Sequence, residues 1–427
     1  MPPTASLPEL DFELLDDRYS RQRLIASWDQ QKLANTRIVV AGAGALGNEV
    51  LKNLALAGVG NILIVDFDRI EVSNLSRSVL FRDADIGRPK ASTAANALRE
   101  LNPEISVRAL DGDLESDLGL GILRESDLVL GCLDSVHARW ALNRACGRAG
   151  TPWIDAGINA TVGEVCLYVP GDGPCYECGM TQQMWHQIHE RRSCMLLPRK
   201  LPPRVIPTTS VIASVTAALQ VNEALAFIHQ LTSNKAIAQE GTRLAPGETL
   251  FVSISPYSVS RFTTPEKPGC PAHETYVPSI FVEAGPSEIT VMELLDRVPH
   301  AVSLQLDFDV VCGWQCGNCG GTSKSKSTAQ PHIRSAQCRL RTQRNTQRDT
   351  VMRLSAMSGS EAACPECQAA RTPELVHEIS RFDSLAGESL EALGVPPRAI
   401  LRAKTDSGNC CVELTKAEEL VAADFRK

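Results

Sequence analysis

The apolar residues of the first part of the chain form short buried runs that alternate with stretches of helical spacing. The runs at 37–41, 61–66 and 128–132 predict strands buried on both faces, and the stretches at 47–57, 91–101 and 136–149 predict helices. Strands that alternate with helices in this way form a parallel sheet covered by helices on both faces. The pattern therefore predicts an α/β fold of the Rossmann-like type.

The pattern changes after Pro152. Residues 153–170 alternate and contain glycines, which predicts antiparallel strands added to the same sheet. The stretch 175–207 is predicted to be rich in loops, and Thr208 or Thr209 is expected to cap a long helix that runs to about Ile228. A further strand is expected at 249–254, so the sheet should be mixed but largely parallel.

The last third of the chain has a different character. It predicts a short helix at 287–297, a half-buried strand at 301–312, a helical turn at 390–393 and strands at 400–404 and 411–414. Between them, residues 323–348 are too poor in apolar side chains to pack. The predicted organisation is an N-terminal extension (1–17), a nucleotide-binding domain (18–275) and a smaller cysteine-rich α+β domain (285–427).

Composition narrows the possible partners. The chain has 427 residues, 43% of them hydrophobic, and a formal net charge of −7, which argues against a general binder of nucleic acid or of anionic membranes. The longest apolar stretch, 211–228, carries Gln220, Asn222 and Glu223 and therefore predicts a buried helix rather than a membrane span. The first residues lack the pattern of a signal or transit peptide, so a cytoplasmic location is expected.

The fifteen cysteines are spaced in a way that indicates metal binding. Two-ligand motifs occur at Cys175 and Cys178, at Cys270 and His273, at Cys316 and Cys319, and at Cys364 and Cys367. Four such motifs predict two zinc sites, and the last two motifs are typical of a zinc ribbon, with Cys312 and Cys338 as possible substitute ligands. Separately buried free thiols are the alternative explanation for the first two motifs.

A glycine-rich loop follows the first predicted strand and opens the first predicted helix. Gly42, Gly44 and Gly47 would turn the backbone N–H groups of the loop and the positive end of the helix dipole towards an anion. Asp66, at the end of the next strand, is placed to accept a hydrogen bond from a ribose hydroxyl. Alone, this pattern also fits a nicotinamide or flavin enzyme, or a turn needed only for close packing.

The polar residues downstream favour ATP over a dinucleotide. Arg77 and Lys90 can neutralise a triphosphate, and Asp134, just beyond the third predicted strand, can hold Mg²⁺. Asp68 and Asn74 belong to the same set. A hydride-transfer enzyme requires no such combination.

With these residues in place, the chain resembles the E1-like activating enzymes, the superfamily that includes ThiF, MoeB and the adenylation half of ubiquitin-activating enzymes. The resemblance covers about residues 18–275. It rests on RYSRQ (18–22), AGAGALGNEVLKNLALAGVGNILIVDFDRIEVSNLSR (41–77), GRPKA (87–91) and GCLDS (131–135).

The resemblance implies roles for individual residues. ATP would be bound by the loop and the polar residues after it, namely Gly42, Gly44, Ala45, Gly47, Asp66, Asp68, Asn74, Arg77 and Lys90. Asp134 would bind magnesium, and Arg21 would reach the nucleotide of a neighbouring subunit, which implies a homodimer. Cys175, Cys178, Cys270 and His273 match the structural zinc site of the family, with His273 in place of the usual fourth cysteine.

Cys194 lies in the loop where E1-like proteins that form a thioester or persulfide carry their active cysteine. Arg191 and Arg192 precede it and can lower the pKa of its thiol, which favours the thiolate needed to attack an adenylate. An incidental loop cysteine is the alternative.

The leading hypothesis is an enzyme that adenylates the C-terminal glycine of a ubiquitin-like protein and then holds it as a thioester on Cys194 for an E2-like partner. The runner-up is activation of a sulfur-carrier protein, in which the adenylate becomes a thiocarboxylate. Two alternatives from other classes are an NAD-dependent oxidoreductase and a catalytically silent scaffold. The set Arg77, Lys90 and Asp134 disfavours both.

Overall fold

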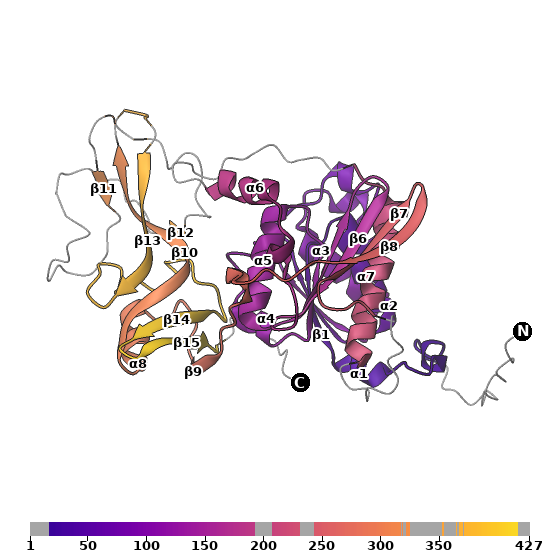
Figure 1. Cartoon of the computed structure of the whole chain (residues 1–427), viewed down its shortest axis with the longest axis horizontal. Coiled ribbons are helices and arrows are strands. Elements are labelled where there is room, and N and C mark those ends of the chain that lie inside the picture. Colours follow the sequence, from indigo (N-terminus) through magenta and orange to yellow (C-terminus); the bar gives the residue numbers. More distant parts are fainter. Residues whose placement is uncertain are drawn as a thin grey trace, which may run out of the picture.

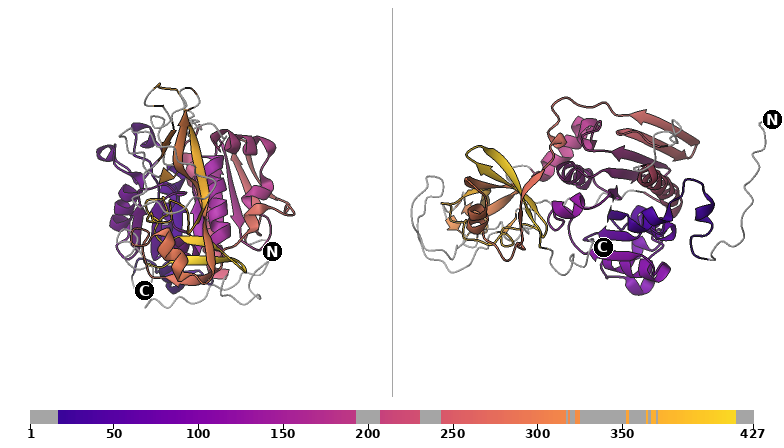
Figure 2. Two further views of the ribbon diagram at one scale, coloured as in Figure 1. Left: turned by 90° about the vertical axis from the view of Figure 1, so that its left-hand side faces the viewer. Right: turned by 90° about the horizontal axis from the view of Figure 1, so that it is seen from below.

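The computed structural model describes residues 17–192, 207–230, 243–316, 318, 322–324, 352–353, 364, 367–369 and 371–416. These residues form two bodies that lie side by side, each built around its own sheet (Figures 1 and 2). Apolar side chains fill both faces of the first sheet. A separate apolar cluster forms the core of the second body.

An eight-stranded sheet organises the first body. Its strands are β1 (Arg37–Ala41), β2 (Asn61–Val65), β3 (Ser106–Leu110), β4 (Leu128–Gly131), β5 (Trp153–Ile158), β6 (Val162–Tyr168), β7 (Glu248–Ile254) and β8 (Tyr257–Thr263). They lie in the order β3-β2-β1-β4-β5-β6-β7-β8, with parallel pairing from β3 to β5 and antiparallel pairing from β5 to β8. The predicted Rossmann-like fold with a mixed sheet is confirmed.

Helices cover both faces of this sheet. They are α1 (Gln30–Asn35), α2 (Ala45–Ala57), α3 (Lys90–Leu101), α4 (Leu120–Arg124), α5 (Val136–Ala149), α6 (Gln182–Arg192) and α7 (Ser210–Gln230), with 3₁₀ turns η1 (Gln22–Leu24), η2 (Val72–Asn74), η3 (Asp83–Asp85), η4 (Tyr176–Gly179) and η5 (Pro271–His273). Helices α2, α3 and α7 share one apolar cluster with the sheet, and α4 and α5 share another.

Helix α7 is the predicted long helix. Within the described residues it is the one helix that length and composition would allow to cross a membrane, but more than half of that stretch is buried in the fold. Its buried Gln220 donates to the carbonyl oxygens of Gly131 (3.0 Å) and Ile154 (2.9 Å), on β4 and β5. The polar side chain that argued against a membrane span therefore joins two strands of the core.

The second sheet has the order β11-β10-β14-β15-β9, with β12 and β13 also paired to β10. Its elements are β9 (Pro278–Val282), α8 (Val291–Arg297), β10 (Ala301–Cys316), β11 (Thr322–Lys324), β12 (Met352–Arg353), β13 (Arg371–Ser380), β14 (Ile400–Thr405) and β15 (Gly408–Leu414). Strand β9 lies between residue 275, the predicted end of the first domain, and residue 285, the predicted start of the second. These domain boundaries stay predictions. Most of the polar segment 323–348 lies outside the described residues.

Several predicted elements need correction. The segment predicted as loop contains α6, because Ile188 packs with Trp140 of α5 although few other residues of α6 are apolar. Helix α8 starts four residues later than expected, since Thr290 accepts a hydrogen bond from the N–H of Glu293 and forms a capping box there. Strand β10 continues past residue 312 to Cys316. Strands β3, β8, β9 and β13 were not predicted.

A buried cluster of charges joins the two bodies. Arg398, only 5% exposed, lies 2.7 Å from Glu413 of β15 and 2.6 Å from Glu125, which ends α4. The carbonyl oxygen of Arg398 also accepts a hydrogen bond from the N–H of Gly121 (2.8 Å). Removal of one partner from such a buried pair leaves an uncompensated charge, so the contact holds the second body firmly against α4.

Candidate functional site

The predicted phosphate loop lies at the carboxyl ends of the parallel strands. Gly42 directly follows β1, and its N–H donates to the carbonyl oxygen of Val65 at the end of β2 (2.8 Å). Gly44 precedes the first residue of α2, so the N-terminus of this helix opens at the loop. In parallel sheets this edge, beside a helix N-terminus, is the usual place for phosphate groups.

The three glycines of the loop differ in why a side chain would not be tolerated at their positions. A Cβ atom on Gly42 would lie 2.5 Å from the carbonyl oxygen of Cys132, and one on Gly47 would lie 2.0 Å from that of Gly42. Both glycines are therefore required by packing. A Cβ atom on Gly44 would meet no atom within 4 Å. The open space in front of Gly44 leaves room for a ligand to approach the backbone.

Two polar side chains hold the loop in this shape. Asp66 accepts hydrogen bonds from the N–H groups of Ala43 (2.7 Å) and Asp68 (2.8 Å). Buried Asn48, in the first turn of α2, donates to the carbonyl oxygens of Ala43 (2.7 Å) and Gly44 (3.0 Å). Each carboxylate oxygen of Asp66 keeps a second lone pair, so a ribose hydroxyl can still donate to it.

The surroundings of Asp66 shift the pKa of its carboxyl group in opposite directions. Burial raises the pKa of its carboxyl group, while the N–H of Ala43 and the ammonium group of Lys90 act in the opposite direction. Lys90 in turn forms an ion pair with Asp68 (2.8 Å), and only 9% of Lys90 is exposed. A polar chain thus runs from the loop through Asp66 and Asp68 to Lys90.

Asn74 and Arg77 lie on the segment that includes η2. The side-chain oxygen of Asn74 accepts from the N–H of Glu71 (2.9 Å), and the half-buried Arg77 donates to the carbonyl oxygen of Ser73. The segment is tied to the loop by Asn48, whose side-chain oxygen accepts from the N–H of Leu80 (2.9 Å). Asn48 thus fixes both the loop and the segment that carries Arg77.

Asp134 follows β4 and is exposed. It forms no hydrogen bond or ion pair with another residue in the part of the chain that the structure describes, so its carboxylate is available to a cation. The turn around it is rigid, because Arg139 donates to the carbonyl oxygen of Leu133 (2.9 Å) and pairs with Asp155 (3.1 Å). Burial raises the pKa of Asp155 to about 6, although Arg139 acts against this shift.

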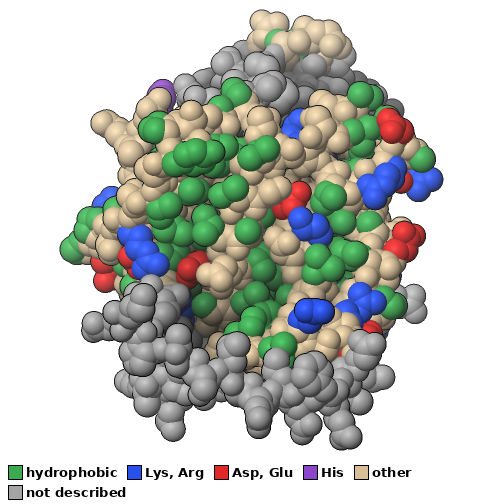
Figure 3. All heavy atoms as spheres, turned by 90° about the vertical axis from the view of Figure 1, so that its right-hand side faces the viewer, with side chains coloured by type: hydrophobic (Ala, Val, Ile, Leu, Met, Phe, Trp, Pro, Cys, Tyr) green, Lys and Arg blue, Asp and Glu red, His purple; other side chains and the backbone are tan. Residues whose placement is uncertain are grey.

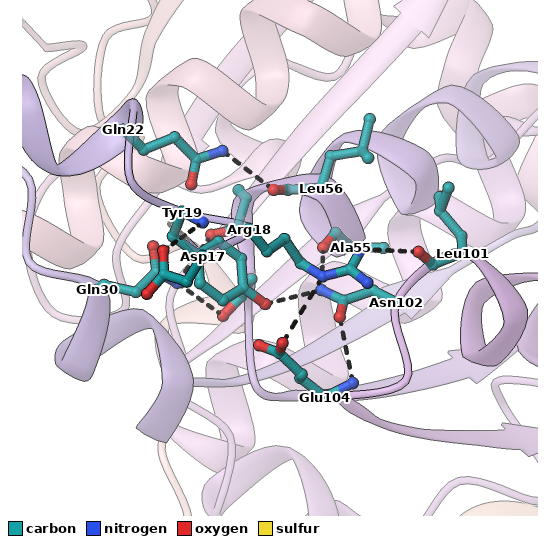
Figure 4. A network of polar contacts seen from close by, with 12 residues as sticks. Asp17, Arg18, Tyr19, Gln22, Gln30, Ala55, Leu56, Leu101, Asn102 and Glu104 are labelled. Carbon is teal, nitrogen blue, oxygen red and sulfur yellow. Dashed lines mark hydrogen bonds and ion pairs between the residues drawn. The ribbon is translucent and has the colours of Figure 1, made fainter. Parts of the chain in front are cut away.

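Arg21 lies far from this loop. It is exposed, on the N-terminal segment shown in Figure 4, and neighbours of Arg21 tie that segment to the distal ends of two helices. Gln22 donates to the carbonyl oxygen of Leu56 at the end of α2 (3.0 Å), and Arg18 donates to that of Leu101 at the end of α3 (2.9 Å). Asn102 bonds to both Tyr19 and Ala55.

The four predicted ligands of the first zinc site converge. Their ligand atoms all lie within 4.8 Å of one another. Sulfur–sulfur distances are 3.8 Å for Cys175–Cys178 and 3.7 Å for Cys175–Cys270, and Cys178 lies 3.4 Å from Nε2 of His273. Tetrahedral zinc with Zn–S bonds of about 2.3 Å separates its sulfurs by about 3.8 Å.

The surroundings of this cluster also suit a metal. Nδ1 of His273 lies 3.4 Å from a carboxylate oxygen of Glu266, the kind of partner that orients metal-bound histidines. Burial raises the pKa of Cys175 to about 12, so a thiolate there needs a compensating cation. The residues present therefore fit zinc, which would join the segment after β6 to the segment before β9.

The structure describes only some of the other predicted site residues. Cys316, Cys364 and Cys367 also converge, whereas Cys319 and Cys194 lie outside the described residues. Sequence reasoning missed Asn48, Arg139 and Asp155. For Asn48 the available signal was a polar residue directly after the glycine loop, at the start of a predicted helix. The pairing of Arg139 with Asp155 had no local signal.

Comparison with known proteins gives consistent matches. A model described as the ThiF family matches residues 19–272. The chain is 34% identical over 269 residues to the sulfur carrier protein adenylyltransferase of Thermus thermophilus, an alignment that covers 60% of this chain and 89% of that protein.

Two further relatives are also named as activating or adenylylating enzymes. The SAMP-activating enzyme E1 of Haloferax volcanii is 31% identical over 264 residues (60% of this chain, 87% of that protein). The molybdopterin-synthase adenylyltransferase of Escherichia coli is 37% identical over 172 residues (39% and 68%). The family match ends before β9, so the second sheet falls outside it.

The different roles of the glycines lead to a direct test of the loop. We expect Gly44→Ala to unfold at the wild-type temperature but to bind ATP at least about tenfold more weakly, because the new methyl group occupies the open space. Gly47→Ala serves as the contrasting variant and should lose about 1–3 kcal/mol of stability, since its Cβ atom has no room. Calorimetric titration with ATP and thermal unfolding measure the two effects. Wild-type ATP affinity in Gly44→Ala would place the phosphates elsewhere.

Proposed function

Because the chain belongs to the ThiF family of E1-like adenylating enzymes, we propose that it uses ATP to adenylate the C-terminal glycine of a ubiquitin-like or sulfur-carrier protein. The observation that carries this proposal is the open loop at Gly44. At the same sheet edge lie the buried cation Lys90 and the available carboxylate Asp134. An ATP-dependent adenylyl transfer needs a phosphate cradle, cationic groups and a metal ligand of this kind.

The reaction joins a carboxylate to the α-phosphate. An oxygen of the carrier's terminal carboxylate attacks the α-phosphorus, the bond to the oxygen that bridges the α- and β-phosphates breaks, and pyrophosphate leaves. The attacking carboxylate is already ionised at neutral pH, so the step needs no general base. Catalysis depends on positioning and on neutralisation of phosphate charge.

The described residues can supply both requirements. Backbone N–H groups of the loop and the N-terminus of α2 face the phosphates, and Lys90 and Arg77 provide positive charge from anchored positions. Asp66 is placed for the ribose. Mg²⁺ held by Asp134 would offset charge on the departing pyrophosphate.

The position of Arg21 supports a homodimer. The N-terminal segment is tied to the end of α2 that lies farthest from the loop, and a helix of 13 residues is about 20 Å long. Arg21 therefore lies too far from its own loop to contact a nucleotide there. We propose that it reaches the loop of a second copy of the chain.

An apolar surface is available for this second copy. Figure 3 shows hydrophobic side chains gathered across the face that carries α2, α7 and β8. Each of these elements has a large exposed apolar side chain, namely Leu56, Val211 and Val259. Exposed apolar side chains that gather on one face are typical of a surface that is covered in an assembly.

Two proposals compete for the step after adenylation. The names of the relatives from Thermus thermophilus and Escherichia coli favour thiocarboxylate formation on a sulfur carrier. A thioester on Cys194, passed to an E2-like protein, is the second candidate. Its support is the position of Cys194 after α6, next to Arg191 and Arg192 in the sequence.

Pyrophosphate exchange tests the adenylation step. With a carrier protein that ends in glycine, the wild-type chain should exchange labelled pyrophosphate into ATP. Lys90→Met and Asp134→Ala should each lower the rate by about 10²-fold or more, because the first removes a positive charge and the second removes the ligand of Mg²⁺. Arg88→Ala is a matched control, since Arg88 is an exposed neighbour of Lys90 that pairs with Asp85. Absence of exchange with every glycine-terminated carrier of the host cell would refute the proposal.

Mixed dimers test the position of Arg21. Arg21→Ala and Asp134→Ala should each be inactive alone. After subunit exchange, about a quarter of the wild-type rate should return, because half of the dimers are mixed and each mixed dimer has one complete site. Arg23→Ala, on the same segment, should stay active, since Arg23 pairs with Asp17 of its own chain. No recovery in the mixture would exclude action between subunits.

Mass spectrometry of the products decides the second step. If Cys194 forms a thioester, incubation with ATP and the carrier gives an enzyme–carrier adduct that a thiol reagent releases and that Cys194→Ser lacks. Cys410→Ser, which removes a cysteine of β15, should keep the adduct. If the carrier is instead a sulfur carrier, no adduct forms, and a sulfur donor converts the adenylate to a thiocarboxylate with Cys410→Ser and wild type alike.

A further inference from the structure

Three cysteines converge at one end of the second sheet, beyond the part of the chain that matches the family. Cys316 is the last residue of β10, and Cys364 and Cys367 precede β13, the antiparallel partner of β10. Their sulfur atoms lie within 4.8 Å of one another, and those of Cys316 and Cys367 are 3.5 Å apart. Cys316 and Cys364 are almost completely buried.

The backbone around Cys364 and Cys367 is shaped to aim both thiols at one point. The N–H of Gln368 donates to the carbonyl oxygen of Cys364 (2.8 Å), and the N–H of Cys364 donates to that of Ala369 (2.8 Å). Gln368 has φ of 59°, a left-handed conformation that costs a non-glycine residue about 1–2 kcal/mol. Such strain persists where the surroundings impose it, and it is often found at functional sites.

The sequence repeats this arrangement around Cys316. Cys319 follows Cys316 at the same spacing, and Gly320 occupies the position that corresponds to Gln368. Cys319 and Gly320 lie outside the described residues.

The described part of this end of the sheet has no apolar core of its own. Among the described residues, the apolar cluster of the second body reaches no farther along β10 and β13 than Cys312 and Val376. Past that level the buried side chains on these strands and the turn between them are Trp314, Cys316 and Cys364. Small regions without sufficient apolar burial commonly depend on a metal for stability.

We propose that Cys316, Cys364 and Cys367 bind a structural zinc ion. The observed spacing of 3.5 Å approaches the sulfur–sulfur separation of about 3.8 Å in tetrahedral zinc thiolates. Each thiol loses its proton to solvent when the Zn–S bond forms. Arg371 pairs with Cys316 across the two strands, and its guanidinium group lies over the ring of Trp314 (4.8 Å).

The metal joins β10 to the turn before β13 and so fixes the end of this strand pair. It is separate from the cluster of Cys175, Cys178, Cys270 and His273, and it takes no part in the adenylation step. The proposal therefore does not depend on the proposed function.

Metal analysis of the full-length chain tests the site. Cys364→Ser with Cys367→Ser should contain one zinc fewer per chain than wild type, as measured by inductively coupled plasma mass spectrometry. Cys410→Ser should contain the wild-type amount, and the double variant should become sensitive to proteases near residue 371. Pyrophosphate exchange should stay close to wild type in both, so failure of the metal proposal can be told apart from failure of the adenylation proposal.

A conservative variant covers the case in which the double variant does not fold. Cys367→His replaces one thiolate by an imidazole and should retain the zinc, whereas Cys367→Ala should lose it. Cobalt substitution of the wild-type chain should give the charge-transfer band of thiolate ligands, weakened in Cys367→His. An unchanged zinc content in the double variant, or iron in place of zinc in the purified protein, would overturn the proposal.

Discussion

The nucleotide site depends on how the backbone of the glycine loop is held from behind. Asp66 binds the N–H of Ala43, and Asn48 binds the carbonyl oxygens of Ala43 and Gly44, so side chains from the end of β2 and from α2 meet at one peptide unit. The loop therefore has the conformation needed to bind an anion before any ligand is bound. Preorganised donors of this kind lose little entropy when a phosphate binds.

The same clamp also positions the charges around the loop. Asn48 reaches the segment of Arg77 through the N–H of Leu80, and Asp66 reaches Lys90 through Asp68. The distance of Arg21 from this network is therefore informative. Each chain holds every predicted nucleotide ligand of its site except this arginine, and this is the reason why we propose that two copies exchange it.

The sequence predicted the features that depend on local pattern or on spacing. The runs that form β1, β2 and β4 were recognisable because they are buried on both faces. The convergence of the cysteine motifs could be expected because cysteines separated by two residues commonly act together as metal ligands. Strand β3 was missed because SVRAL has only five residues and two of them, Ser106 and Arg108, are polar. Helix α6 was missed because it depends on contacts of Ile188 with α5. Pairs such as Arg139 with Asp155 lie on separate elements, and one sequence holds no signal that joins them.

The buried guanidinium of Arg398 also limits how the two bodies can move. A hinge between them would have to break the pairs of Arg398 with Glu125 and of Glu413 with Arg124, and Glu413 is fully buried. The second body is therefore expected to stay fixed against α4 rather than to rotate about the linker. If a carrier protein docked on the second body, its distance from the nucleotide loop would be fixed, and its C-terminal tail alone would have to cross that distance.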